Sequence, residues 1–248
     1  MSAERKIVGF DRKIELEWLD ATAAQVAHGA GREDVRAFLW KMLEGSVSAG
    51  SLGFNSDRGK TITVLAHVWS EVPEGVEALR ERALKLIQEV DPGHRIAVHW
   101  AMCMATYPFF RDVASTVGRM TALQDRIAIA EIRRRLSEQW GDRDITRRAS
   151  QRIIRSFIAW GVLDDSDKRG TYERASKRLA VGGAVAEALV EGLLMSLERH
   201  IVPAAQLASH PAIFPFDVKL SLAELRRAPR FIVEREGLDG EVIGLARP

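Results

Sequence analysis

Four arginines and a glutamine recur at helical spacing in the middle of the chain: Arg147, Arg148, Gln151, Arg152 and Arg155. At about 100° per residue they fall within an arc of roughly 140° on one side of a helix over residues 146–160. No acidic residue shares this arc. A guanidinium can hold a phosphate, or the O6 and N7 edge of guanine, through two hydrogen bonds, and Gln151 can pair with an adenine edge. The chemistry that these residues offer is recognition of nucleic acid.

The opposite side of this predicted helix is apolar. Ile145, Ala149, Ile153, Phe157 and Trp160 share one face. We expect this face to be buried against the preceding helices, because an amphipathic helix turns its apolar stripe toward the core.

The elements that must position this helix follow a specific order. Apolar spacing predicts helices over residues 113–123 and 127–140 before it. A short strand at 161–163, a polar loop at 164–170 and a returning strand at 171–174 are predicted after it. Three helices followed by a β-hairpin is the layout of a winged helix-turn-helix.

The polar loop would then be the wing of this unit. Lys168 and Arg169 lie near its tip, where they would reach a DNA backbone or a minor groove. Three aspartates in the same loop, Asp164, Asp165 and Asp167, argue the other way, because they would repel phosphate.

Positive charge is concentrated in this part of the chain. The 248 residues carry a formal net charge of only +2, yet residues 111–178 contain sixteen Lys and Arg against ten Asp and Glu, a balance of +6. The remainder is therefore acidic, at about −4. Any contact with DNA should be confined to one face of the protein.

These patterns predict a mainly α protein of the α+β class with three regions. Residues 1–110 are expected to form a helical N-terminal domain, and residues 111–178 the winged helix-turn-helix. Residues 179–248 are expected to form a long helix, over 179–197, and a small α+β region. No internal repeat is present at the spacing of repeat proteins.

The last region contains two local signals. Ser221 and Glu224 form a capping box that would open a short helix, which Pro229 must end. A two-stranded hairpin is predicted over residues 231–233 and 241–243, with Gly237, Asp239 and Gly240 between the strands. These strands would also offer an edge for a homodimer.

A loop at residues 53–61 superficially resembles a phosphate-binding loop. Five residues separate its two glycines, whereas the phosphate-binding motif requires four. We interpret it as a loop entering a helix, with Asn55 or Ser56 as the cap and with Arg58 and Lys60 as surface charges.

No metal, cofactor or catalytic site is expected. His99 and Cys103 are one helical turn apart, but two ligands in an apolar helix favour a core histidine and a core thiol over zinc. The single cysteine favours a reducing, cytoplasmic compartment. No export signal is visible, and Glu187 and Glu191 make the most apolar run too polar for a membrane span.

Three stretches resemble the BrxA-type proteins of BREX phage-defence systems. They are residues 55–65 (NSDRGKTITVL), 99–113 (HWAMCMATYPFFRDV) and 147–163 (RRASQRIIRSFIAWGVL), within a match over roughly residues 16–163. The resemblance implies a small helical DNA-binding component of a defence system, without a catalytic motif. The chain differs from that family in having a longer wing and some eighty residues after the winged helix. These differences leave open which other defence proteins would be its partners.

Two functions are therefore consistent with the sequence. The first is a non-enzymatic protein that binds double-stranded DNA, as a component of a defence system or as a transcriptional regulator. The second is a scaffold whose winged helix docks a partner protein. In the first, Arg143, Arg147, Lys168 and Arg169 would contact phosphates, and Arg148, Gln151, Arg152 and Arg155 would reach base edges. Thr146, in the first turn of the helix, completes the predicted contact set.

Overall fold

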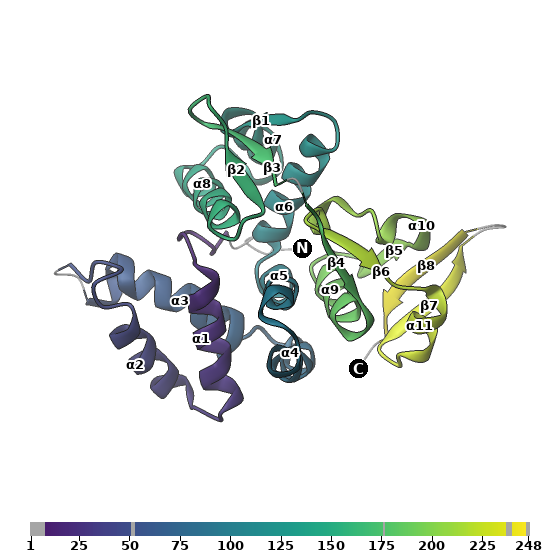
Figure 1. The fold of residues 1–248 in the computed structure, drawn as a ribbon, viewed down its shortest axis with the longest axis horizontal. Helices are drawn as coiled ribbons and strands as arrows, with labels where there is room; N and C mark the ends of the chain where they lie inside the picture. Colours follow the sequence, from purple (N-terminus) through teal and green to yellow (C-terminus); the bar gives the residue numbers. More distant parts are fainter. Residues whose placement is uncertain (1–7, 51–52, 176, 237–239, 247–248) are drawn as a thin grey trace, which may run out of the picture.

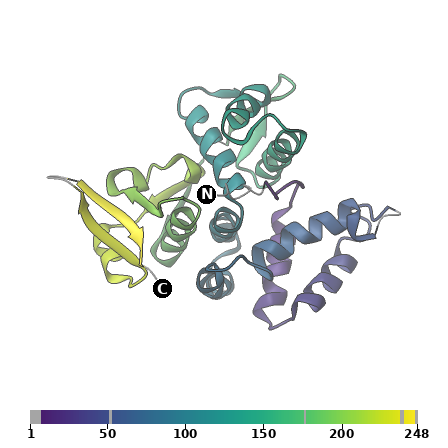
Figure 2. The same ribbon diagram turned by 180° about the vertical axis from the view of Figure 1, so that it is seen from behind.

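The protein is described here by a computed structural model, which covers residues 8–50, 53–175, 177–236 and 240–246. Its first part is helical: α1 (Leu16–Ala27), α2 (Arg32–Met42), η1 (Gly53–Asn55), α3 (Asp57–Trp69), α4 (Glu77–Glu89), η2 (Pro92–His94), α5 (Arg95–Thr106) and α6 (Pro108–Thr121), where η denotes a single 3₁₀ turn. The α1–α3 helices and the C-terminal strands lie at opposite ends of the molecule, with α5 between them (Figures 1 and 2).

Helix α5 is the centre of the core. Every residue from Ala97 to Thr106 is buried, as expected for a helix that is apolar nearly all round. The Trp100 ring stacks on Phe157 at a centroid distance of 4.7 Å and meets Phe216 edge to face at 5.6 Å. One continuous hydrophobic core therefore joins residues from all three predicted regions.

Helix α5 also packs closely against α9 (Gly183–Met195). An added Cβ at Gly192 would lie 2.4 Å from the carbonyl oxygen of Ala101, so only glycine allows the two backbones to approach this closely.

The middle of the chain contains α6, β1 (Arg126–Ala128), α7 (Ile129–Trp140), α8 (Asp144–Ala159), β2 (Leu163–Asp165) and β3 (Thr171–Arg174). The strands form an antiparallel sheet in the order β1-β3-β2. The prediction of a helix from residue 127 was wrong at its start, because residues 126–128 pair as a strand with residues 171–173. Gly141, at φ 82°, ends α7 in a conformation that favours glycine and turns the chain into α8.

The C-terminal region contains β4 (Leu179–Gly182), α9, β5 (Ile201–Pro203), α10 (Ala204–Leu207), η3 (Pro211–Ile213), β6 (Phe216–Lys219), α11 (Leu222–Arg227), β7 (Phe231–Glu236) and β8 (Gly240–Leu245). Strand β4 pairs in parallel with β6, so the prediction of one helix over residues 179–197 was wrong for its first four residues. The capping box of Ser221 and Glu224 is confirmed, and α11 ends before Pro229.

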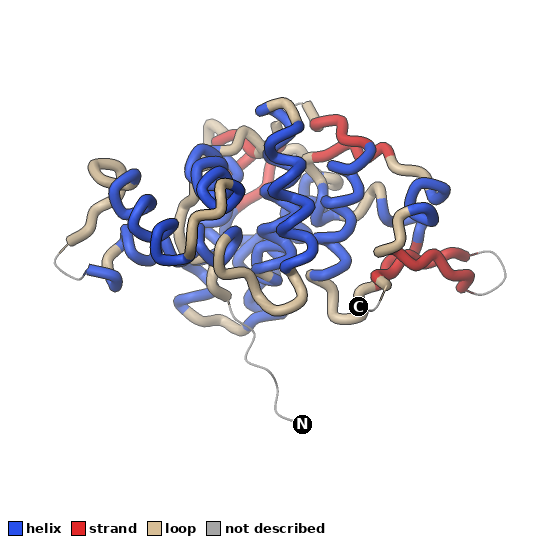
Figure 3. The backbone as a smooth tube through the Cα atoms, turned by 90° about the horizontal axis from the view of Figure 1, so that it is seen from below, coloured by secondary structure: helices blue, strands red, loops and turns tan. Residues whose placement is uncertain are grey.

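The predicted C-terminal hairpin is confirmed, and it extends from one end of the molecule (Figure 3). Residues 237 and 239, placed in its turn, lie outside the described residues. Strand β8 lies between β5 and β7. Val242 and Ile243 are therefore paired on both sides and offer no open edge for a homodimer, whereas within the described ranges β7 is paired on one side.

No helix in the described ranges has the length and apolar character needed to cross a membrane. The chain is a mixed, mainly helical protein with small sheets, which agrees with the predicted α+β class.

Candidate nucleic-acid interface

Helix α8 has one buried side and one exposed side. Ala149, Ile153 and Phe157 are fully buried, as predicted. Ile145 is 44% exposed, however, and Thr146 is 1% exposed. Thr146 was expected among the contact residues, but it belongs to the packed side of α8 and is not available to a ligand on the exposed side.

The exposed side carries two arginines without partners. Arg148 and Arg152 are exposed, one helical turn apart, and within the described ranges their guanidinium groups have no hydrogen bond or ion pair. Their charge is therefore available to an external anion. This pair is the strongest element of the predicted contact set.

The other two arginines of this side are already paired. Arg147 pairs with Asp144, and with Asp142 at 3.1 Å, while Arg155 pairs with Asp165 at 3.0 Å. The hydrogen bond from Arg147 lowers the pKa of Asp144, so this carboxylate stays charged well into the acid range. All of these groups are solvent-exposed, where water and salt screen an ion pair and leave it only weakly stabilising. A phosphate can therefore replace the aspartates at little cost.

Gln151 and Arg143 are held by neighbouring groups. Gln151 is exposed and its side-chain oxygen accepts a hydrogen bond from Arg133 of α7 at 2.8 Å, which leaves its amide N–H₂ free to donate. Arg143 precedes α8 and donates to the carbonyl of Trp140 at 3.1 Å. Gln151 lies on α8 beside Arg152, whereas Arg143 is the N-cap residue at the start of this helix.

The loop between β2 and β3 places two further cations in solvent. Lys168 and Arg169 are exposed, and in the part of the chain described here their side chains make no ion pair. The loop is closed by the Thr171 amide, which donates to the carbonyl of Lys168 at 3.0 Å. Asp167 is paired with Arg126 of β1 at 3.1 Å.

Strand β2 extends to Asp165, so the strand predicted at 161–163 begins and ends two residues later, and Asp164 and Asp165 lie in it and not in the loop. Two of the three aspartates predicted for the wing have an ion-pair partner. Asp165 and Asp167 each face an arginine, and only Asp164 lacks an ion pair among the described residues. The expected repulsion of phosphate by this loop is correspondingly weaker. Arg126, which pairs with Asp167, and Arg133, which donates to Gln151, were not singled out from the sequence because their roles depend on the pairing of β1 and the packing of α7.

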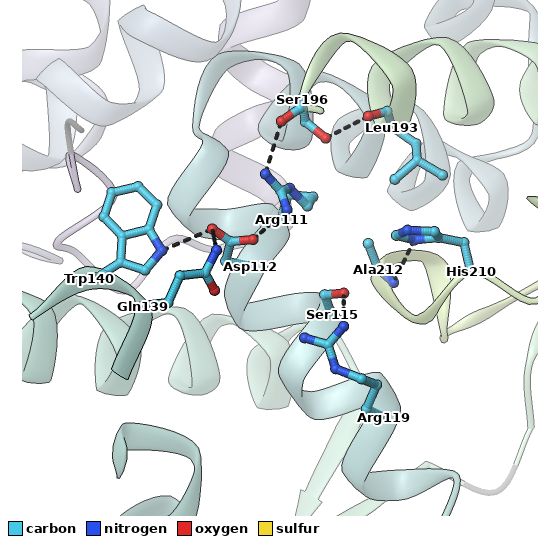
Figure 4. A network of polar contacts seen from close by, with 10 residues as sticks. All are labelled: Arg111, Asp112, Ser115, Arg119, Gln139, Trp140, Leu193, Ser196, His210 and Ala212. Atoms are coloured by element: carbon cyan, nitrogen blue, oxygen red, sulfur yellow. Dashed lines mark hydrogen bonds and ion pairs between the residues drawn. The ribbon is translucent and has the colours of Figure 1, made fainter. Parts of the chain in front are cut away.

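A buried polar network holds α7 on α6 (Figure 4). Asp112 is buried and its Oδ2 accepts from the Trp140 indole at 2.9 Å and from the Gln139 amide at 3.1 Å. Its Oδ1 pairs with Arg111 at 2.5 Å, and Arg111 also donates to the carbonyl of Ser196 at 3.0 Å. One carboxylate therefore fixes the helix before α8 to the rest of the protein.

The N-terminal segment holds the other end of α8. The amide of Ile14 donates to Ser156 Oγ at 2.9 Å, and the Trp160 indole donates to the carbonyl of Ile14 at 2.8 Å. Both hydrogen bonds are buried. Together with the Asp112 network they give α8 a fixed orientation, which a specific contact surface requires.

Other motifs have structural roles. Ser56 caps α3 by accepting from the Gly59 amide at 3.1 Å. The prediction of Arg58 as a surface charge was wrong, because it is 8% exposed and donates to the Val47 carbonyl at 2.9 Å. His99 and Cys103 are fully buried, as predicted. His99 contacts Asp20, and burial lowers its pKa.

No group of three metal-ligating side chains occurs among the described residues. Comparison of the chain with models of known families, with curated proteins and with solved structures found no match. The function proposed below therefore depends on the geometry of this chain alone.

Proposed function

We propose that residues 108–174 form a winged helix-turn-helix that binds double-stranded DNA in the cytoplasm, with α8 in the major groove and residues 164–170 as the wing. The order α6-β1-α7-α8-β2-β3 and the sheet order β1-β3-β2 support this assignment, because a winged helix has this topology. The protein would act by binding and not by catalysis.

The observation that carries the proposal is the pair Arg148 and Arg152. Both lie on the third helix of the unit, on its exposed side, without an acidic partner. Arginines placed in this way gain hydrogen bonds to phosphate or to guanine without losing an internal ion pair.

The binding energy would come mainly from phosphates. The sequence pattern assigned Arg148 and Arg152 to base edges. Because their guanidinium groups are exposed and have no ion-pair partner in the described ranges, we propose that they contact phosphates instead, together with Lys168 and Arg169. If each of the four neutralises one phosphate, the logarithm of the association constant falls with the logarithm of the salt concentration with a slope of about −3.6. The affinity for DNA is then about 150-fold lower at 200 mM than at 50 mM salt. The resemblance to BrxA-type proteins would place this binding in phage defence; a transcriptional regulator would use the same interface.

The second candidate is a protein-docking scaffold. The observation that favours it is exposed apolar surface in the same unit: Ile145 is 44% exposed and Leu123 is 85% exposed. A large apolar side chain in solvent is more typical of a protein contact than of a phosphate contact.

A mobility shift with a duplex of mixed sequence, at 50 and 200 mM salt, separates the two candidates. The DNA-binding proposal expects a shift at 50 mM that weakens by about two orders of magnitude at 200 mM. The absence of a shift at both concentrations would contradict it and favour the scaffold.

A further inference from the structure

A cavity of about 510 Å³ lies between α6 and the η3 turn, outside the predicted DNA-contact set. Helix α6 contributes Gly118 and Arg119, and the C-terminal region contributes His210, Pro211 and Phe214. Arg135 of α7, Arg174 of β3, Arg178 and Ser209 add further polar groups to its lining. This volume is in the range of small-molecule sites.

The charge of this cavity is one-sided. Four arginines line it, and no carboxylate does. Arg119 donates to the neutral Ser115 hydroxyl at 3.2 Å, and Arg178 donates to the carbonyl of Phe216. Of the four, Arg135 alone pairs with a carboxylate in the described part of the chain, that of Glu131 at 2.8 Å.

Arg174 has no side-chain hydrogen bond or ion pair within the described ranges. Among the described residues, three of the four guanidinium groups thus have no carboxylate partner, so an anion that binds here does not have to displace one. The planar fork of arginine matches an oxyanion such as phosphate or carboxylate through paired hydrogen bonds.

The rest of the cavity is apolar. Met120 and Phe214 are buried and Leu123 is exposed at its edge. Gly118 also lines the cavity, and a Cβ added to it would lie 2.1 Å from the Pro211 carbonyl oxygen, so only glycine lets α6 and the η3 turn approach this closely. A ligand that fills this space needs an apolar or aromatic body in addition to its charge.

His210 adds a neutral donor. Its Nδ1 accepts from the Ala212 amide at 3.2 Å. Burial, together with Arg111 and Arg119, lowers the pKa of His210 to about 4, so the ring is neutral at pH 7 and its proton is on Nε2.

We propose that this cavity is a binding site for a small organic anion, with a phosphate or carboxylate group held by Arg119, Arg174 and Arg178 and with an aromatic or apolar body against Met120 and Phe214. Such a ligand would contact α6 and the C-terminal turn together. The site is independent of the DNA interface, because none of its lining residues belongs to the predicted contact set.

Isothermal titration calorimetry with 1-naphthyl phosphate, 1-naphthoate and uncharged 1-naphthol tests this site in the absence of DNA. We expect at least one of the two anions to bind at least tenfold more tightly than 1-naphthol, and the stronger of the two identifies the acid group. Equal affinity for 1-naphthol, or no binding of either anion, would overturn the proposal.

The double variant Arg119→Gln/Arg174→Gln should weaken anion binding at least tenfold. Both side chains are exposed, so the variant is expected to fold, and its circular dichroism spectrum should match that of the wild type. Arg134→Gln/Arg226→Gln is the charge-matched control, because both are exposed arginines outside the cavity, paired with Glu138 and Glu241. An unchanged dissociation constant in the folded double variant would refute the assigned residues, and so would an equal loss in the control.

Discussion

The pair Arg148 and Arg152 gives the sharpest test of the DNA interface. In the double variant Arg148→Ala/Arg152→Ala, two phosphate contacts should be lost. Because neither guanidinium has an internal partner, no buried group or ion pair is disturbed, and the melting temperature should be unchanged. The counterion contribution of two contacts predicts a slope of log K against log salt that is shallower by about 1.8.

The same arithmetic gives the loss of affinity. At 0.1 M salt the loss of two phosphate contacts should weaken the association constant for DNA about 60-fold, which is roughly 2.4 kcal/mol of binding free energy. The loss should shrink about 12-fold between 50 and 200 mM salt, because fewer counterions are released when the variant binds. Fluorescence anisotropy with a labelled duplex at four salt concentrations measures both quantities.

A charge-matched control separates contact from general attraction. Arg134→Ala/Arg226→Ala also removes two exposed arginines, one from α7 and one from α11, and each is ion-paired with a glutamate. We expect less than a threefold change in affinity for this variant. If both double variants lose affinity equally, or if the slope of Arg148→Ala/Arg152→Ala does not change, α8 is not the contact surface.

Four further predictions concern stability. Asp112→Ala should lower the free energy of unfolding by about 3–5 kcal/mol in urea titrations, because it leaves Arg111 and a buried indole unpaired; a loss below about 1 kcal/mol would contradict the network. Gly192→Ala should lower the free energy of unfolding by about 1–3 kcal/mol, because the new Cβ clashes with α5. Gly93→Ala is the control and should not destabilise the protein, because no atom lies within 4 Å of a Cβ at that position. Equal melting temperatures of the two variants would exclude the close approach of α9 to α5. Thr146→Val removes a buried hydroxyl that has no hydrogen-bond partner, so the melting temperature should rise. The affinity for DNA should not change, because Thr146 lies on the packed side of α8. Weaker DNA binding by this variant would show that Thr146 contributes to the interface. The free energy of unfolding should fall as the pH decreases from about 6.5 toward 4, because His210 binds a proton in the unfolded chain but stays neutral in the folded protein. In the variant His210→Asn, which keeps a cap acceptor for η3, the free energy of unfolding should fall less between pH 7 and pH 5 in denaturant titrations. An equal fall in both proteins would contradict the lowered pKa of His210.

The sequence was sufficient to predict which segment carries the candidate site and which side of α8 faces solvent. Arg148 and Arg152 are exposed as predicted, because a helical period can be read from one segment alone. The pairing of Arg147 and Arg155 with aspartates was not predicted. The partner of Arg155 is in strand β2 and that of Arg126 is in the loop that follows it, and the meeting of these segments depends on tertiary packing.

The boundary between the two sides of α8 was misplaced by about one residue. Apolar identity placed Ile145 inside and Thr146 outside, and the structure has the reverse. Packing against the neighbouring elements, not the polarity of a single residue in the first turn, decides which is covered. Strand β1 was missed for a similar reason, since three residues become a strand only through pairing with β3, more than forty residues later.

The hydrogen bonds between Ile14 and helix α8 have a consequence for the newly made chain. Trp160 follows Ile14 by 146 residues, so a ribosome adding about 5–20 residues per second needs roughly 7–30 s between the two. During that interval Phe10 and Ile14, both fully buried in the finished protein, lack part of their cover. The N-terminal helices therefore complete their packing only after α8 has emerged, and a chain truncated before α8 should be a substrate for chaperones.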